Sequence, residues 1–268
     1  MTIIQASICA SNKAIVLIGD RLVTVSEIYE AEAKSQKLYD FGLFGIGFAG
    51  TLSDIISVKD AILENPPTFS NFIESISKIY NQENETREDS FFKRYSLLDK
   101  QEFKEYVQHD EGKIPEDVIE WIYANFHSIR LECIAVAVGF NEKKEPQIVF
   151  INQFGDQFNQ TESNHCAIGS GETFSDVFFD VNEYDPYCTL DQGLFFAFRA
   201  KKSAEAHIGV GQNTDIVIIE LNLDPVFILN ESAEMRKLEE IYKNERVNIY
   251  DLYNDSAQKV KGIIDEIR

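Results

Sequence analysis

The chain has 268 residues, and its 45 acidic and 25 basic side chains give a formal net charge of −20 at neutral pH. An acidic surface repels nucleic acid and anionic membranes, so we expect neither as a partner. Apolar residues make up 44% of the chain and aromatic residues 12%, which is enough for a large folded core and excludes a mainly disordered protein.

The four cysteines are scattered, form no Cys-x-x-Cys pair and have no histidine at ligand spacing, so we expect no bound metal and no cofactor. Cys9, Cys133 and Cys166 lie in apolar runs, which predicts buried free thiols in a reducing compartment. The first apolar run is short and Lys13 follows it, so we expect no secretory signal. No window has the apolar length of a membrane span, and the sequence therefore indicates a cytoplasmic protein.

The first 50 residues are organised as two pairs of apolar, β-branched runs. The runs over 3–10 and 14–19 are separated by three polar residues, a pattern that is typical of a β-hairpin. The second pair covers 36–41 and 43–50 and ends in a glycine-rich segment. These runs predict antiparallel strands.

The next part of the chain, up to about residue 127, has mostly helical spacing. Apolar residues three and four positions apart predict helices over 55–63 and from Ser70 to Tyr80. The polar stretch 81–89 breaks this spacing and predicts a mobile loop. Aromatic residues then predict one or two short helices, and Pro115 marks the start of a further one.

Strand and helix patterns alternate again in the second half. We expect strands over 131–139, 147–152, 165–168, 214–221 and 225–229, helices over 172–179 and 189–206, and a helical tail over 231–268. The order of strands, helices, strands, helices and strands predicts an α+β fold, an αββα sandwich in which two antiparallel sheets lie between two helical layers.

Thr2 is the residue with the clearest chemical potential. A small second residue permits removal of Met1, and Thr2 would then carry a hydroxyl and a free α-amine on the same residue. An N-terminal threonine can activate its own hydroxyl through that amine, which makes it a nucleophile for amide hydrolysis.

The arrangement of residues around Thr2 resembles the start of proteasome-type β-subunits, which are N-terminal nucleophile hydrolases. The matching positions are a threonine that opens the first strand, an Asp-Arg pair that ends the second, a lysine that opens the third, a glycine that ends the fourth, and a Gly-Ser-Gly segment: Thr2, Asp20 with Arg21, Lys37, Gly50, and Ser170 within 169–171. The resemblance covers the first 54 residues and roughly 130–220.

The resemblance implies a catalytic role for each of these positions. Thr2 would attack the substrate carbonyl, and Lys37 would accept or relay its proton. Asp20 would orient Lys37, the Gly50 backbone N–H would stabilise the oxyanion, and Ser170 would bind the Thr2 amine.

Each assignment has an alternative that the residues leave open. Lys34 could replace Lys37 as the lysine of the pattern. Asp20 could be a turn residue paired with Arg21, and Ser170 could cap the following helix. The segment 206–211 departs from the family pattern, because it has no serine and offers only His207 in place of an acid.

The sequence thus predicts a threonine-type hydrolase of peptide or amide bonds that forms a homo-oligomer, as a proteasome-like peptidase subunit. The alternatives are a non-catalytic ring or scaffold subunit and an amidase for a small substrate. The sequence identifies no unfoldase partner. We expect one hydrolase-like domain over 1–230, with a helical insertion at 81–127, and a C-terminal helical extension over 231–268.

Overall fold

The computed structural model describes residues 2–26, 29–32, 36–42, 44–64, 71–96, 98–108, 114–125 and 129–245. Several sequence predictions fall outside these ranges: the start of a helix at Ser70, the alternative lysine at position 34, and the part of the helical tail beyond residue 245. The chain divides into two compact units, Met1–Val226 and Phe227–Arg268. In the second unit, residues 233–245 are helical. The predicted boundary at residue 230 stays a prediction.

The first sheet has five antiparallel strands in the order β10-β1-β2-β11-β12. They span Ile3–Cys9 (β1), Ala14–Asp20 (β2), His165–Gly169 (β10), Thr214–Glu220 (β11) and Val226–Ile228 (β12). Strands β1 and β2 form the predicted hairpin, and residues Ala10, Ser11 and Asn12 make its turn with positive φ angles. Every residue of β1 and β2 is buried, which explains their nearly continuous apolar sequences.

The second sheet also has five antiparallel strands, in the order β5-β6-β7-β8-β9. They span Leu38–Asp40 (β5), Phe44–Gly50 (β6), Cys133–Phe140 (β7), Pro146–Ile151 (β8) and Gln157–Asn159 (β9). The two sheets pack closely: a Cβ added at Gly47 of β6 would lie 2.3 Å from Ile4 Cγ2 of β1. A separate two-stranded ribbon, β3 (Leu22–Ser26) with β4 (Tyr29–Glu32), follows β2.

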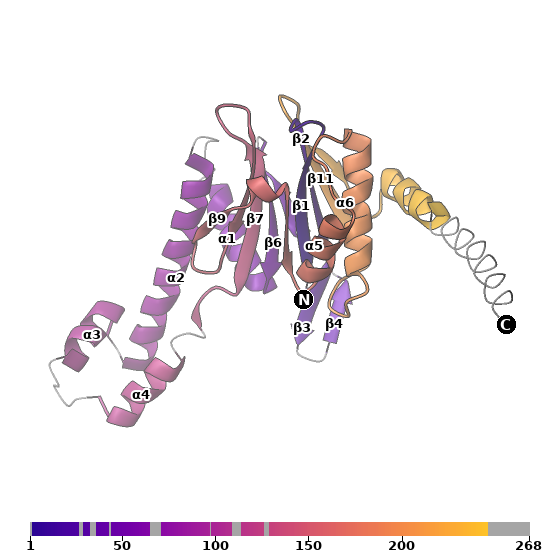
Figure 1. The fold of residues 1–268 in the computed structure, drawn as a ribbon. Helices are drawn as coiled ribbons and strands as arrows, with labels where there is room; N and C mark the ends of the chain where they lie inside the picture. Colours follow the sequence, from indigo (N-terminus) through magenta and orange to yellow (C-terminus); the bar gives the residue numbers. More distant parts are fainter. Residues whose placement is uncertain are drawn as a thin grey trace, which may run out of the picture. The chain divides into compact units, whose positions relative to one another are not determined.

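Helices cover the outer face of each sheet within the first unit (Figure 1). Helices α5 (Glu172–Val181) and α6 (Leu190–Ala204) pack on the first sheet, and α1 (Leu52–Glu64) and α2 (Phe72–Ser96) lie on the side of the second. Helix α6 begins with a capping box between Thr189 and Gln192. The sequence prediction also starts this helix at residue 189. The predicted αββα sandwich of two antiparallel sheets is therefore confirmed.

The prediction of a mobile loop over 81–89 is wrong, because these residues lie in the middle of the 25-residue helix α2. Two of their polar side chains, Asn84 and Glu88, are buried and lie four positions apart, which is a helical spacing. Asn84 bonds the backbone of Leu131 and Gln153, and Glu88 pairs with Lys100 and Arg130. The short helices α3 (Lys100–Gln108) and α4 (Glu116–Asn125) lie at the far end of α2 (Figure 1). None of the described helices has the length and apolar character of a membrane span.

Candidate functional site

Thr2 and Asp20 meet at one end of the first sheet. Thr2 directly precedes β1, and Asp20 is the last residue of β2. Because Ile4 pairs with Gly19 in the antiparallel hairpin, the residues just before β1 lie beside the end of β2. The Thr2 hydroxyl donates a hydrogen bond to Asp20 Oδ1. Both residues are buried, with 4% and 1% of their surface exposed.

Lys37 reaches the same point from the second sheet. Its Nζ donates to Thr2 Oγ1, to Asp20 Oδ1 at 2.8 Å and to the Leu22 carbonyl. The Lys37 carbonyl accepts the N–H of Phe48 at 3.0 Å, so Lys37 extends the pairing of β5 with β6. Lys37 is 3% exposed. Three acceptors therefore surround one Nζ, and one of them is a carboxylate.

Ser170 lies on the other side of Thr2, at the end of β10. The Thr2 N–H donates to Ser170 Oγ at 3.1 Å. The Ser170 hydroxyl in turn donates toward two backbone carbonyls, that of Thr2 at 3.2 Å and that of Gly209 at 3.1 Å. Gly171 is the N-cap residue of helix α5, and no side-chain hydrogen bond caps this helix end. The serine hydroxyl therefore faces Thr2, and the alternative that it caps α5 is wrong.

Arg21 does not pair with Asp20. Its guanidinium forms a buried, two-pronged ion pair with Asp215, with distances of 2.6 and 2.7 Å. Asp215 is the second residue of β11, which pairs with β2. The Asp20 carboxylate is thus left to Thr2 and Lys37 through Oδ1, and to the Gly211 N–H, at 2.7 Å, through Oδ2.

Gly50 ends β6 at the edge of the sheet that carries Lys37. Its φ is +140°, and an added Cβ would lie 1.9 Å from the Glu132 carbonyl oxygen, so this position requires glycine. The residue is exposed. Its role as an oxyanion donor stays a prediction.

His207 takes part in a local turn. Its Nδ1 accepts the N–H of Gly209 at 3.2 Å, and its ring lies 5.8 Å from that of Phe174. The backbone after His207 is what reaches the site, because the Gly209 carbonyl accepts from Ser170 and the Gly211 N–H donates to Asp20. These backbone contacts could not be predicted from the side chains of this segment. The signal for them in the sequence was the pair Gly209 and Gly211, because glycine lets the backbone approach other groups closely.

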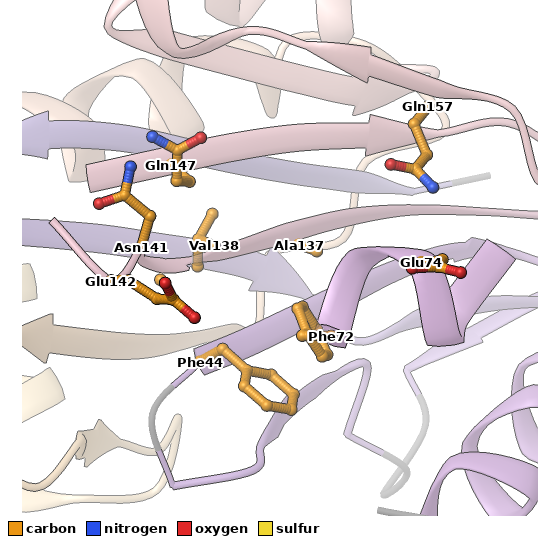
Figure 2. Close-up of a pocket in the computed structure, with 10 residues that line it drawn as sticks. Phe44, Phe72, Glu74, Ala137, Val138, Asn141, Glu142, Gln147 and Gln157 are labelled. Carbon is orange, nitrogen blue, oxygen red and sulfur yellow. The ribbon is translucent and has the colours of Figure 1, made fainter. Parts of the chain in front are cut away.

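A cavity of about 370 Å³ lies elsewhere, between the first turn of α2 and the second sheet. Phe72 and Glu74 of α2 are among the residues that line it (Figure 2). Phe44, Ala137 and Val138 provide apolar walls, and Glu74 and Glu142 stand at its margin. Phe44 is six residues from Gly50 along β6, which corresponds to about 20 Å of extended strand. This cavity is therefore at the opposite end of the strand from Thr2.

The cysteines are not in the predicted catalytic set, although Cys133 pairs with Gly50 across β6 and β7. Cys9 and Cys133 are buried, as predicted, whereas Cys166 is only half-buried. Burial raises the pKa of each of these three thiols to about 12, so they are protonated and unreactive at neutral pH. Among the residues that the structure describes, no group of three or more His, Cys, Asp and Glu side chains could hold a metal ion.

Comparison with solved structures places the fold among Anbu (ancestral beta-subunit) proteins. The chain matches Anbu from Yersinia bercovieri with a TM-score of 0.62 and 12% identity, over 93% of this chain and 97% of that one. It matches the Anbu (Gly-1) mutant from Hyphomicrobium sp. strain MC1 with a TM-score of 0.61 and 13% identity, over 94% and 97%. It matches the helical assembly of the Anbu complex from Pseudomonas aeruginosa with a TM-score of 0.63 and 15% identity, over 94% and 96%.

These comparisons correct the family suggested by the sequence. No family model and no curated protein sequence matches the chain. The matching structures are Anbu proteins, so the assignment to proteasome-type β-subunits is wrong. Residue patterns such as Thr2, Asp20 and Lys37 follow the geometry of a sandwich edge and do not identify one family. At 12–15% identity the likeness establishes the fold alone.

Proposed function

We propose that this chain is a threonine-type N-terminal nucleophile hydrolase that cleaves peptide or amide bonds, with Thr2 as its nucleophile after removal of Met1. The observation that carries the proposal is the bridge that Lys37 Nζ makes between Thr2 Oγ1 and Asp20. A lysine, a carboxylate and a threonine hydroxyl in mutual contact at the second residue of the chain provide both a nucleophile and the charge that activates it.

The contacts of Lys37 favour one proton route. Lys37 Nζ is already engaged with three acceptors, so we assign the free α-amine of Thr2 as the base that takes the hydroxyl proton. Thr2 Oγ1 then bonds to the substrate carbonyl carbon, and the leaving amine receives the proton from the α-ammonium. Water hydrolyses the resulting ester. Lys37 stabilises negative charge on Oγ1, and Asp20 fixes the position of Lys37.

Ser170 and Gly50 have supporting parts in this proposal. The Ser170 hydroxyl already accepts the Thr2 N–H at 3.1 Å, and it would hold the α-amine in the same place after processing. The Gly50 N–H would donate to the oxyanion, at the sheet edge that also presents Lys37.

A non-catalytic member of this fold is the alternative. It is favoured by the segment after α6, in which His207 bonds its own turn and only backbone groups reach Ser170 and Asp20. An amidase for a small substrate would use the same residues as the proposed peptidase. The cytoplasmic location expected from the sequence also stays a prediction.

We further expect the protein to act as a homo-oligomer. The matching Pseudomonas aeruginosa structure is a helical assembly. In this chain, α5 exposes three apolar residues on one face: Phe174, Val177 and Val181, with 42%, 52% and 75% of their surface exposed. An exposed apolar stripe of this kind is typical of a surface that another protein molecule covers.

Substitution of Thr2 tests the proposed function. Hydrolysis of fluorogenic peptides and aryl amides is measured for the wild type, for Thr2→Ala and for Thr2→Ser. We expect no turnover with Thr2→Ala, and residual turnover with Thr2→Ser, which keeps the hydroxyl. Thr173→Ala, at an exposed position of α5, is the matched control. Undiminished hydrolysis by Thr2→Ala would show that another residue is the nucleophile.

A further inference from the structure

Lys201 is a fully buried cation that the proposed mechanism does not use. It lies in α6 with 0% of its surface exposed. Its Nζ donates to the Gly211 carbonyl at 2.8 Å, to the Gln212 carbonyl at 3.1 Å and to Glu205 Oε1. Burial lowers the pKa of Lys201, and the nearby charges of Glu205 and Asp20 act in the opposite direction. A buried ammonium needs hydrogen-bond acceptors or opposite charges that offset the cost of its desolvation.

The segment that Lys201 holds is the one that touches the Thr2 site. Gly211 accepts from Lys201 through its carbonyl, and it donates through its N–H to Asp20 Oδ2 at 2.7 Å. Two residues earlier, the Gly209 carbonyl accepts from Ser170 Oγ at 3.1 Å. One lysine therefore secures the backbone that positions both Asp20 and Ser170.

We propose that Lys201 is a positioning residue for the Thr2 site. By fixing residues 209–212, it keeps the Gly211 N–H on Asp20 Oδ2, so that Asp20 Oδ1 faces Lys37 and Thr2. The proposal rests on the proposed function only in calling this site catalytic. The contacts through Gly211 to Asp20 exist whatever the site does.

Lys202 provides a matched control. It is the next residue of α6, its Nζ pairs with the same Glu205 at 2.9 Å, and its side chain is only 7% exposed. Its ammonium lies over the Phe198 ring, 5.2 Å from the centroid. If buried positive charge in α6 mattered only for stability, Lys201→Met and Lys202→Met would affect the Thr2 site alike.

The first measurement does not depend on hydrolysis. In Thr2→Cys, the rate of alkylation of the N-terminal peptide by iodoacetamide is followed against pH by mass spectrometry. The pKa of about 12 of Cys9, Cys133 and Cys166 keeps their background alkylation slow. Adding Lys201→Met should disturb Asp20 and Lys37, raise the pKa of the introduced thiol and slow its alkylation at neutral pH about tenfold. Adding Lys202→Met should leave the rate unchanged.

The second measurement uses turnover. Lys201→Met should lower kcat with little change in KM, because substrate-binding surfaces are not touched. In an Asp20→Asn background the same substitution should have a smaller further effect, limited to the part that acts through Ser170, since its other route runs through Asp20. Equal, additive losses in both backgrounds would contradict the proposal.

The outcomes separate this inference from the proposed function. A slower thiol reaction in a protein without hydrolytic activity would support positioning by Lys201 and refute the hydrolase. Unchanged alkylation and kcat in an active enzyme would overturn the role of Lys201 alone. If Lys201→Met does not fold, Lys201→Gln takes its place, because its amide can still donate to a carbonyl. If neither variant folds, Lys201 is a structural cation and the proposal is wrong.

Discussion

The Lys37 ammonium is the group on which the proposed chemistry depends most. Its bonds to Thr2, Asp20 and the Leu22 carbonyl fix its position beside Thr2 Oγ1. Lys37→Ala should therefore lower kcat by at least about 10²-fold, because members of a catalytic unit are strongly interdependent. Ser170→Ala should cost less, since it removes hydrogen bonds only to backbone groups of Thr2 and Gly209. Steady-state kinetics compare the two, and a larger loss with Ser170→Ala would contradict the assigned roles.

Asp176 on α5 gives the protein a predictable pH dependence. Its Oδ1 is buried and has no hydrogen-bond partner among the residues that the structure describes; it lies 3.9 Å from His165 Nε2. Burial, followed by the charges of Glu172 and Asp180, raises the pKa of Asp176 from 3.8 to about 6. The folded protein thus binds this proton more tightly than the unfolded chain. The resulting stabilisation is complete below pH 3.8 and is lost as the pH rises through about 6.

Asp176→Asn should remove this dependence. We expect the variant to have a higher Tm than the wild type at pH 8, and the difference to shrink toward pH 5, where Asp176 is largely protonated. Thermal unfolding at several pH values measures it. Asp224→Asn, at an exposed turn position, is the control. A constant Tm difference between Asp176→Asn and wild type across this range would contradict the raised pKa.

The residues of the candidate site could be predicted only in part. Thr2, Asp20, Lys37 and Ser170 were identified by residue type and order, and the structure brings all four into contact. The partner of Arg21 could not be predicted, because Asp215 lies almost 200 positions away and only the pairing of β11 with β2 brings it close. Backbone contacts such as that of Gly211 carry no side-chain signature, and only the two glycines at 209 and 211 indicate them.

Among the elements, the buried central strands were predicted, whereas the strands β3, β4 and β9 and the course of α2 were not. The strands β1, β2, β6 and β7 are buried along nearly their whole length, so apolar runs identify them. Helix α2 buries polar residues in its middle, and Asn84 and Glu88 find their partners on other elements. Such a helix lacks the apolar stripe by which helices are recognised in a sequence, so the pattern predicts a loop. Its buried polar side chains find hydrogen-bond partners only through tertiary contacts.

Asn84 should be essential for the attachment of α2. It is 8% exposed, accepts the Leu131 N–H at 2.9 Å and donates to the Gln153 carbonyl at 2.9 Å. Asn84→Ala leaves both backbone groups without this partner and should lower the free energy of unfolding by about 2–4 kcal/mol. Gln82→Ala, exposed on the same helix, should change it by less than about 0.5 kcal/mol. Urea unfolding gives both values, and equal effects would contradict the tertiary role of Asn84.

At the scale of the whole molecule, the apolar face of α5 is the surface to test for association. We expect the purified protein to be oligomeric by light scattering at micromolar concentration. Because Val177 and Val181 are exposed, replacing both with Asp should reduce the particle mass without unfolding the chain. Leu63→Asp, at an exposed position of α1, is the control. A monomeric wild type, or a double variant of unchanged mass, would contradict this surface as an interface.

The state of the N-terminus tests the central claim most directly. Thr2 can act through its own amine only when Met1 has been removed, since a peptide bond to Met1 takes that amine away. Mass spectrometry of the purified protein, before and after a slowly hydrolysed amide or ester substrate is added, reports both processing and acylation. We predict an N-terminal peptide that begins at Thr2 and gains the acyl mass in the presence of substrate. Full hydrolysis by a protein that retains Met1 would contradict Thr2 as the nucleophile.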